Sequence, residues 1–261
     1  AIGRAGRQGD PGTSRFYVSL EDDVVSGELA DDIEKYISGK RRISTRKIRK
    51  IINGAQRSGD DNAVRYRKNA MEYDKVLQKQ RDIIYSTRDE LLSGGNVTVG
   101  TIMNVAAKNI DILLKKRLDK ATLNRYILDN LSTRIDCKID EADLKNKKLV
   151  KEHLFKIIED GITAKESYLD DHMLFTEYIR RCILRAVDDG WVEQVDYLQQ
   201  LQNAMGGRSH AGRNPIFEYQ IEARESFRDM EESIHLNIIR NILLSNVTIV
   251  QKGDKKTINM L

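Results

Sequence analysis

Apolar residues recur every three or four positions along most of the chain, which is the spacing of one face of an α-helix. After Ser44, a residue that favours an N-cap, the pattern continues without a proline to the Gly94-Gly95 pair. Its apolar stripe is formed by Tyr66, Ala70, Tyr73, Leu77, Ile84 and Leu91. We therefore predict one helix over residues 45–92, which Gly54 or Gly59 could bend or break. At ~1.5 Å per residue it would span about 70 Å, which suits a spine against which several domains pack.

Two further helical regions follow this predicted spine. Residues 96–168 repeat apolar side chains at helical spacing and are predicted to form a separate helical module, with the lysine-rich run 145–151 as a solvated helix face. A second stripe ends at Gly206-Gly207, and a third begins after Pro215. These two stripes predict an αα-hairpin over residues 188–240 with a polar, basic tip.

The first fifty residues have a different pattern. Residues 3–12 contain four glycines and a proline, which indicates a loop. The aromatic and β-branched run 15–20 predicts a strand, and the stripe within residues 24–37 predicts a short helix. The chain as a whole is therefore predicted to be mostly α-helical.

Composition supports this picture and excludes several classes. Of the 261 residues, 32% are charged and only two are proline, which favours long helices that face water. The net charge of +4 is too balanced for a dedicated nucleic-acid binder. Cys137 and Cys182 lack the spacing of a zinc site or of a disulfide framework, which fits a protein of a reducing compartment. The apolar run 242–250 is far shorter than the ~18 residues that cross a bilayer.

The glycine-rich opening loop is the clearest candidate for chemistry. Arg4 and Arg7 lie three residues apart among glycines that allow a backbone to approach a ligand closely. Guanidinium groups bind phosphate oxygens in a bidentate manner, so the pair fits a sensor of the γ-phosphate or an arginine finger. The alternative from the pattern alone is a basic turn that binds nothing. The chain also begins without an initiator methionine, and we interpret it as a C-terminal piece of a longer protein.

Other candidate residues favour structural roles. His153, His172 and His235 have no partner at ligand spacing, so no metal site is predicted. The adjacent acids at 22–23, 60–61 and 188–189 point in different directions and suit helix ends or solvent. Trp191 is predicted to anchor the hairpin core.

Three blocks of the sequence resemble one family. Residues 3–22, GRAGRQGDPGTSRFYVSLED, resemble the sixth helicase-type motif and following strand of SecA, the ATPase motor of bacterial protein export. The second block resembles its scaffold helix and comprises Met71-Glu72-Tyr73-Asp74, Val76, Gln80-Arg81, Ile84-Tyr85, Arg88 and Glu90-Leu91-Leu92. The third block is similar to its two-helix finger and comprises Trp191, Glu193, Asp196-Tyr197-Leu198, Arg208, Pro215 and Glu218-Tyr219. The three blocks occur in the family's order over about 220 residues.

The resemblance implies a division of the chain. The expected parts are residues 1–50 as the end of the second nucleotide-binding, RecA-like α/β motor domain, 51–94 as the long helix of the helical scaffold, 96–168 as the helical wing domain, 169–245 as the scaffold return and two-helix finger, and 246–261 as a C-terminal tail. No internal element is predicted for that tail.

The resemblance also implies roles for individual residues. Arg4 and Arg7 would be catalytic arginine fingers, and Gly3, Gly6 and Asp10 would belong to the nucleotide cleft. At the hairpin tip, the residues implied to contact substrate or channel are Arg208, Ser209, His210 and Arg213. The intact motor would use ATP and Mg²⁺, whereas this piece, which contains no G-x-x-x-x-G-K-[ST] loop and no acidic Walker B strand, would hold neither and be inactive alone.

The implied function is that of an ATP-driven motor that pushes preproteins through a SecY-type membrane channel. Its implied partners are that channel, the preprotein, an anionic membrane surface and the N-terminal part of the same motor, without nucleic acid. The implied location is cytoplasmic, at the inner face of the bacterial cell membrane. Two departures, Gln194 after Glu193 where the family has histidine and His210 where it has tyrosine, together with the absence of a zinc-binding tail, resemble an accessory SecA.

Two other classes remain open from the sequence. The arginine motif is shared with superfamily-2 nucleic-acid helicases, although the predicted helices lack the aromatic platform and basic groove that bind single strands. The chain could also be a non-enzymatic helical adaptor that docks on a membrane channel.

Overall fold

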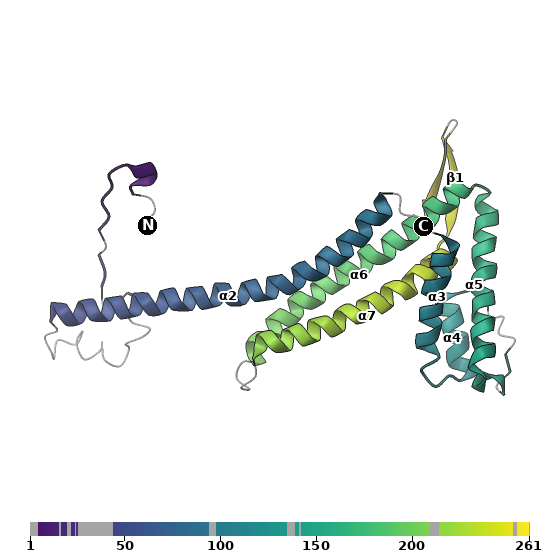
Figure 1. The fold of residues 1–261 in the computed structure, drawn as a ribbon, viewed down its shortest axis with the longest axis horizontal. Coiled ribbons are helices and arrows are strands. Elements are labelled where there is room, and N and C mark those ends of the chain that lie inside the picture. The colour runs from purple at the N-terminus through teal and green to yellow at the C-terminus, as the bar shows by residue number, and fades with distance from the viewer. Residues whose placement is uncertain are drawn as a thin grey trace. The chain divides into compact units, whose positions relative to one another are not determined.

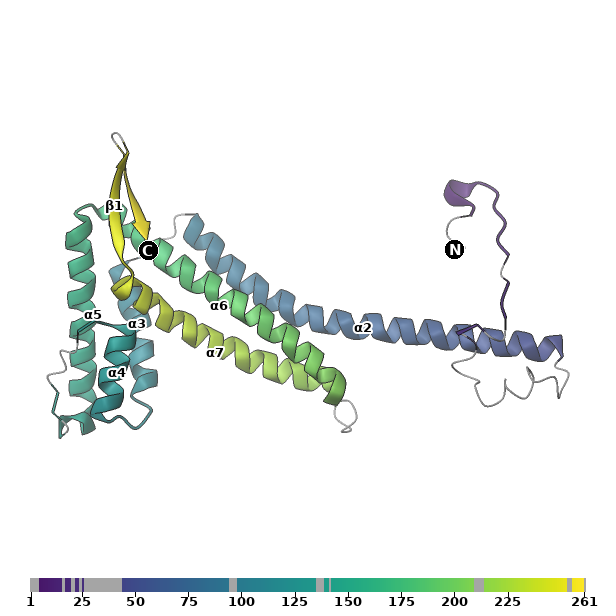
Figure 2. The same cartoon turned by 180° about the vertical axis from the view of Figure 1, so that it is seen from behind.

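The computed structural model describes residues 5–15, 17–19, 22–23, 25, 44–93, 98–134, 139–140, 142–208, 214–252 and 255–260. The chain divides into two compact units, Ala1–Glu72 and Tyr73–Leu261, and the long helix α2 (Thr45–Leu92) belongs to both. The prediction of a mostly α-helical chain is confirmed. Figures 1 and 2 show the helices from opposite sides.

Helix α2 begins and ends where the sequence predicts. The Ser44 hydroxyl accepts a hydrogen bond from the backbone N–H of Lys47 at 3.4 Å, so Ser44 is the N-cap. Gly54 and Gly59 lie within the helix without interrupting it. The break that either glycine could have caused is therefore absent, because i to i−4 hydrogen bonding tolerates isolated glycines at a modest cost.

The predicted strand at residues 15–20 is not formed at the described positions. Arg15 and Tyr17–Ser19 have no regular secondary structure, and the Tyr17 side chain is 84% exposed. A β-strand forms only when neighbouring strands satisfy its backbone groups, and no strand pairs with these residues in the described part of the chain. The predicted helix at 24–37 lies outside the described residues except for Val25, which is buried against Ala55.

The second unit contains a three-helix module, α3 (Val99–Leu113), α4 (Lys120–Asn130) and α5 (Lys147–Leu169). Thr98, Asp119 and Asn146 accept hydrogen bonds from backbone N–H groups in the first turns of these helices. Asp170, in the left-handed conformation at φ 48°, ends α5. The helical module predicted at 96–168 is therefore present, and capping side chains explain where its helices begin.

Helices α6 (His172–Arg208) and α7 (Pro215–Leu244) form the predicted antiparallel hairpin and lie side by side in both views (Figures 1 and 2). Asn214 caps α7 and Pro215 occupies its first turn, where a missing N–H has no cost. The Tyr178 hydroxyl donates to the Ile242 carbonyl oxygen at 2.7 Å and so clamps the two helices at the base of the hairpin.

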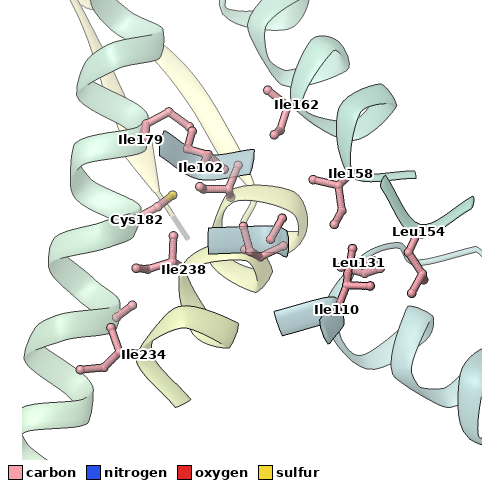
Figure 3. Packing of buried hydrophobic residues seen from close by; sticks show 14 of the residues in the cluster. Ile102, Ile110, Leu131, Leu154, Ile158, Ile162, Ile179, Cys182, Ile234 and Ile238 are labelled. Carbon is pink, nitrogen blue, oxygen red and sulfur yellow. The ribbon is translucent and has the colours of Figure 1, made fainter. Parts of the chain in front are cut away.

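One continuous apolar core joins the base of the hairpin to the three-helix module. Figure 3 shows Ile102 and Ile110 of α3, Leu154 and Ile158 of α5, and Ile238 of α7 within this core. Each of these side chains is at most 6% exposed. The module and the hairpin base therefore share their hydrophobic stabilisation.

The segment expected to be the C-terminal tail forms a β-hairpin. Strands β1 (Val247–Lys252) and β2 (Lys255–Met260) pair antiparallel, with Val247 opposite Met260 and Ile249 opposite Ile258. Ile258 is buried, and its carbonyl oxygen accepts a hydrogen bond from Arg181 Nη1 at 2.9 Å. Two β-branched runs separated by Gly-Asp were a signal for this hairpin that the helical pattern of the chain obscured.

Candidate functional site

The opening loop folds back on itself. A 3-10 turn spans Arg7–Gly9, and positive φ angles occur at Gly6 (68°), Gln8 (57°) and Gly9 (87°). A Cβ atom at Gly6 would lie 3.1 Å from the Asp10 carbonyl oxygen, and one at Gly12 would collide with the Gly6 backbone nitrogen. The glycines therefore allow a close backbone approach, and the nucleotide-cleft role of Gly3, Gly6 and Asp10 stays a prediction.

The arginines of this loop are only partly described. Arg7 has a described backbone, but its side chain is not described, and Gly3 and Arg4 lie outside the described residues. Asp10 is exposed. The structure thus brings Gly6 and Asp10 together in one turn, and the roles of Arg4 and Arg7 stay predictions.

The predicted contact residues at the hairpin tip lie at the edge of the described structure. Arg208 ends α6, with only its backbone described, while Ser209, His210 and Arg213 lie outside the described residues. Asn214 resumes the chain and accepts a hydrogen bond from the Ile216 N–H at 3.1 Å. The two helices next to the tip are thus fixed by capping and by packing.

An apolar cluster holds the part of the hairpin nearest its tip against α2. Met205 of α6 and Tyr219 of α7 are buried, and Tyr73, Val76 and Leu77 of α2 pack on them. The Tyr73 and Tyr219 rings meet edge to face, with centroids 4.7 Å apart. Burial raises the pKa of the Tyr219 hydroxyl to about 12, so this ring stays neutral and packs as an apolar group.

A buried polar circuit joins α2, α6 and α7. Gln194 Nε2 donates to Gln80 Oε1 at 3.0 Å and to Ser226 Oγ at 2.9 Å. Gln80 Nε2 and Ser226 Oγ both donate to the Ala223 carbonyl oxygen, at 2.8 and 3.1 Å. Gln80 and Gln194 are only 6% and 4% exposed. Because the two buried amides hydrogen-bond to each other, the circuit fixes the three helices in one register.

A second polar link lies nearer the hairpin base. Arg88 Nε of α2 donates to Asp188 Oδ1 of α6 at 3.0 Å, and both side chains are partly exposed. Such a pair contributes roughly 0 to 1 kcal/mol in water, so it guides alignment more than it stabilises. The paired acid Asp188 therefore has an ion partner, whereas its neighbour Asp189 faces Arg185 on its own helix at 3.7 Å.

The surface between α6 and α7 is hollowed and acidic. A groove of about 770 Å³ is lined by Gln194 and Tyr197 of α6 and by Ser226 and Met230 of α7. The acids on its wall are Glu193, Glu222, Glu225 and Asp229. The polar circuit thus forms part of the floor of a groove whose charge favours cationic rather than anionic ligands.

Other titratable groups are structural. Burial raises the pKa of the Cys182 thiol to about 12, so the thiol is protonated at neutral pH and is no nucleophile. Burial lowers the pKa of His235, which therefore stays neutral, and the carbonyl oxygen of that residue accepts from Asn109 at 2.8 Å. Across the part of the chain that the structure describes, no group of three potential ligands is placed to hold a metal ion. Trp191 is partly buried and packs against the main core, as predicted.

No helix among the described segments is long and apolar enough to cross a membrane.

The long helix α2, the three-helix module and the α6–α7 hairpin lie within one region that a family model matches. The family model of the SecA wing and scaffold domain matches residues 42–246, and that of the SecA P-loop domain matches residues 1–46. The chain belongs to the SecA family of protein translocase components.

Curated relatives agree with this family. The chain is 34% identical over 263 residues to protein translocase subunit SecA 2 of Streptococcus gordonii and 31% identical over 262 residues to that of Staphylococcus aureus strain NCTC 8325. These matches cover 97% and 96% of the chain. The chain spans about a third of the length of these relatives. Both relatives bear the name SecA 2, in line with the resemblance to an accessory SecA.

Sequence reasoning missed the partners that hold the hairpin to α2. In the sequence, Gln80 is only part of the block that resembles the scaffold helix, and Gln194 is only a departure from the family pattern. A signal was present, because Gln80 lies on the apolar side of α2, three residues after Leu77 and four before Ile84. A glutamine at an apolar position of a helix predicts a buried partner.

Proposed function

We propose that this chain is part of an ATP-driven protein translocase, in which it links the nucleotide-binding motor to a helical hairpin that contacts the moving polypeptide. The carrying observation is the locking of the α6–α7 hairpin onto α2 by the Gln80–Gln194–Ser226 circuit and the Tyr73–Tyr219 contact. A hairpin held at these points follows α2 as one body. Membership of the SecA family supports the assignment.

The proposed role of the opening loop is to complete a nucleotide cleft in the intact protein. ATP with Mg²⁺, bound by the longer protein, would supply the phosphoryl group whose transfer drives the motor. Arg4 and Arg7 would neutralise charge that develops on that group, and Gly3, Gly6 and Asp10 would line the cleft. This chain has no Walker A loop in its sequence, so by itself we expect it to hydrolyse no ATP.

The test of the loop is Arg7→Ala in the intact protein. Arginine fingers act on charge that is present in the transition state, so we expect unchanged nucleotide affinity and a turnover slower by ~10³-fold or more. The matched control is Arg57→Ala, which removes the same charge from an exposed position of α2. Near-normal turnover of Arg7→Ala with nucleotide still bound would eliminate the finger assignment.

The proposed role of the hairpin tip is contact with the preprotein and with a SecY-type channel, through Arg208, Ser209, His210 and Arg213. A photo-crosslinker at position 210 of the intact protein should capture preprotein or channel only while ATP is hydrolysed. The same crosslinker at Gln199, an exposed position of α6, is the control. An active preparation that gives no adduct at position 210 contradicts this role.

The same proposal places the intact protein at the cytoplasmic face of the bacterial membrane, near anionic lipid, as an accessory translocase motor with a restricted set of exported proteins. ATPase stimulation by membranes that contain the channel, and not by RNA, distinguishes this motor from a helicase. Stimulation by RNA alone would favour the helicase.

A further inference from the structure

A pocket of about 370 Å³ lies within the three-helix module, where the end of α3, the start of α4, the 3-10 turn Asp143–Lys145 and the start of α5 meet. Five of its lining residues are cations, namely Lys116, Arg117, Lys120, Lys145 and Lys147. One lining residue is acidic, Asp119. Leucines 114, 118 and 144 complete the wall. The pocket is therefore strongly basic with an apolar side.

The acid in this pocket is already committed to the fold. Asp119 Oδ1 accepts a hydrogen bond from the Thr122 N–H at 2.7 Å as the N-cap of α4. That hydrogen bond, with a smaller contribution from Arg117, lowers the pKa of the Asp119 carboxyl. One fixed carboxylate leaves most of the cationic charge of the five side chains uncompensated.

Three cations elsewhere in the module, Arg125, Lys148 and Lys151, have acidic partners. Lys151 contacts Asp111 at 2.6 Å, and Arg125 contacts Asp129 at 3.5 Å. Among the described residues, Lys120, Lys145 and Lys147 make no such ion pair. Gathering like charges around one hollow raises the free energy of the fold, which a bound anion would offset.

The starts of α4 and α5 depart from the usual charge pattern of helices. Lys120 is the first residue of α4 and Lys147 the first of α5, and neither helix has an acid in its first turn. A positive side chain is unfavourable there because the helix dipole places partial positive charge at the same end. Helices α2, α3 and α6 also begin without an acid, so this pattern alone identifies no site, but here it adds two cations to the pocket wall.

We propose that this pocket binds a phosphate-bearing ligand, either the headgroup of an anionic phospholipid or a soluble organic phosphate. The lysines and Arg117 would bind the phosphate oxygens, and the dipoles of the two helices would add to the attraction. The volume exceeds that of a phosphate alone, and Leu114, Leu118 and Leu144 offer an apolar wall to the carbon skeleton of the ligand. The run 145–151, interpreted from sequence as a solvated face, thus contributes two of the pocket cations. This inference does not depend on the proposed ATPase.

The test uses the 261-residue chain and two probes. Binding of glycerol 1-phosphate is followed by titration calorimetry, and binding to vesicles with equal parts phosphatidylglycerol and phosphatidylcholine by co-sedimentation, with pure phosphatidylcholine as background. The variant is Lys120→Gln with Lys147→Gln. The matched control is Arg125→Gln with Lys156→Gln, which removes the same charge from exposed positions of α4 and α5 outside the pocket.

The pocket variant should bind at least one probe about 25-fold more weakly, since each cation at an anionic surface contributes about five-fold. The control variant should weaken binding by less than a fifth of the fold-change expected for the pocket variant. The thermal midpoint of the pocket variant should not fall, because charge unfavourable to both helix dipoles has been removed. Loss for glycerol phosphate identifies a soluble ligand, and loss for vesicles alone identifies a lipid. Equal losses in variant and control, or no binding of either probe by the unmodified chain, would overturn the proposal.

Discussion

Removing both amides of the circuit should destabilise the second unit less than the sum of the two single removals. Gln194→Met keeps the length of the side chain but leaves Gln80 Oε1 without its donor in a site that is 6% exposed. A buried polar atom without a partner costs about 1 to 3 kcal/mol. In the double variant with Gln80→Met, no atom is stranded, because Ser226 still donates to the Ala223 carbonyl oxygen.

The magnitude follows from a double-mutant cycle. We expect about 2 kcal/mol for Gln194→Met, about 1 kcal/mol for Gln80→Met, and for the double variant at least 1 kcal/mol less than the sum. Gln199→Met, at an exposed position of α6, is the control and should stay within about 0.5 kcal/mol of the unmodified chain.

Urea unfolding measures these energies with two probes. Far-ultraviolet circular dichroism reports the helices, and the fluorescence of Trp191, the single tryptophan, reports the hairpin three residues from Gln194. Coincident transitions allow a two-state treatment. Additive losses, within about 0.5 kcal/mol, would refute the reasoning, because independent sites add and members of one circuit do not.

Two further predictions concern packing and ionisation. Gly190→Ala should lower the stability of the second unit by about 1 to 2 kcal/mol in urea unfolding, since the new Cβ would lie 2.8 Å from Ile234 Cγ1. Gly59→Ala has open space around it and should instead stabilise α2, which would be measured as slower amide hydrogen exchange in that helix. If Gly190→Ala has the same free energy of unfolding as the unmodified chain, the close contact is contradicted. The free energy of unfolding should fall as pH rises from about 8.5 towards 12, because the unfolded chain loses the Cys182 proton at its ordinary pKa near 8.5 while the buried thiol keeps it. Cys182→Ala should make this fall shallower in urea unfolding at each pH, and an identical slope would exclude the thiol as its source.

Helical periodicity was sufficient to predict α2, the three-helix module and the hairpin, because apolar residues recur at helical spacing in each of these elements. It could not predict that Gln80 and Gln194 meet, since their contact joins positions 114 residues apart and depends on how the helices dock. The strand expected at residues 15–20 illustrates the opposite limit. A β-branched run specifies a strand only when the chain also places a partner beside it, and this information is not local.

The opening loop and the hairpin tip were inferred from residue type and resemblance. Glycines at 6 and 12 were predictable as turn residues, and the structure gives the reason, because the two backbones nearly touch. The basic pocket was not predictable. Its cations come from two stretches, 116–120 and 145–147, that only the fold brings together.

The hairpin between α6 and α7 has mechanical consequences. Tyr178 binds Ile242 near its base, Gln194 binds Ser226 midway, and Met205 packs with Tyr219 near its tip. A load applied along the two helices at the tip would act on all three contacts in parallel, so none of them could yield alone. Such a pair resists shear along its axis but carries no soft joint between those points. Sliding of one helix along the other would therefore require all three contacts to break.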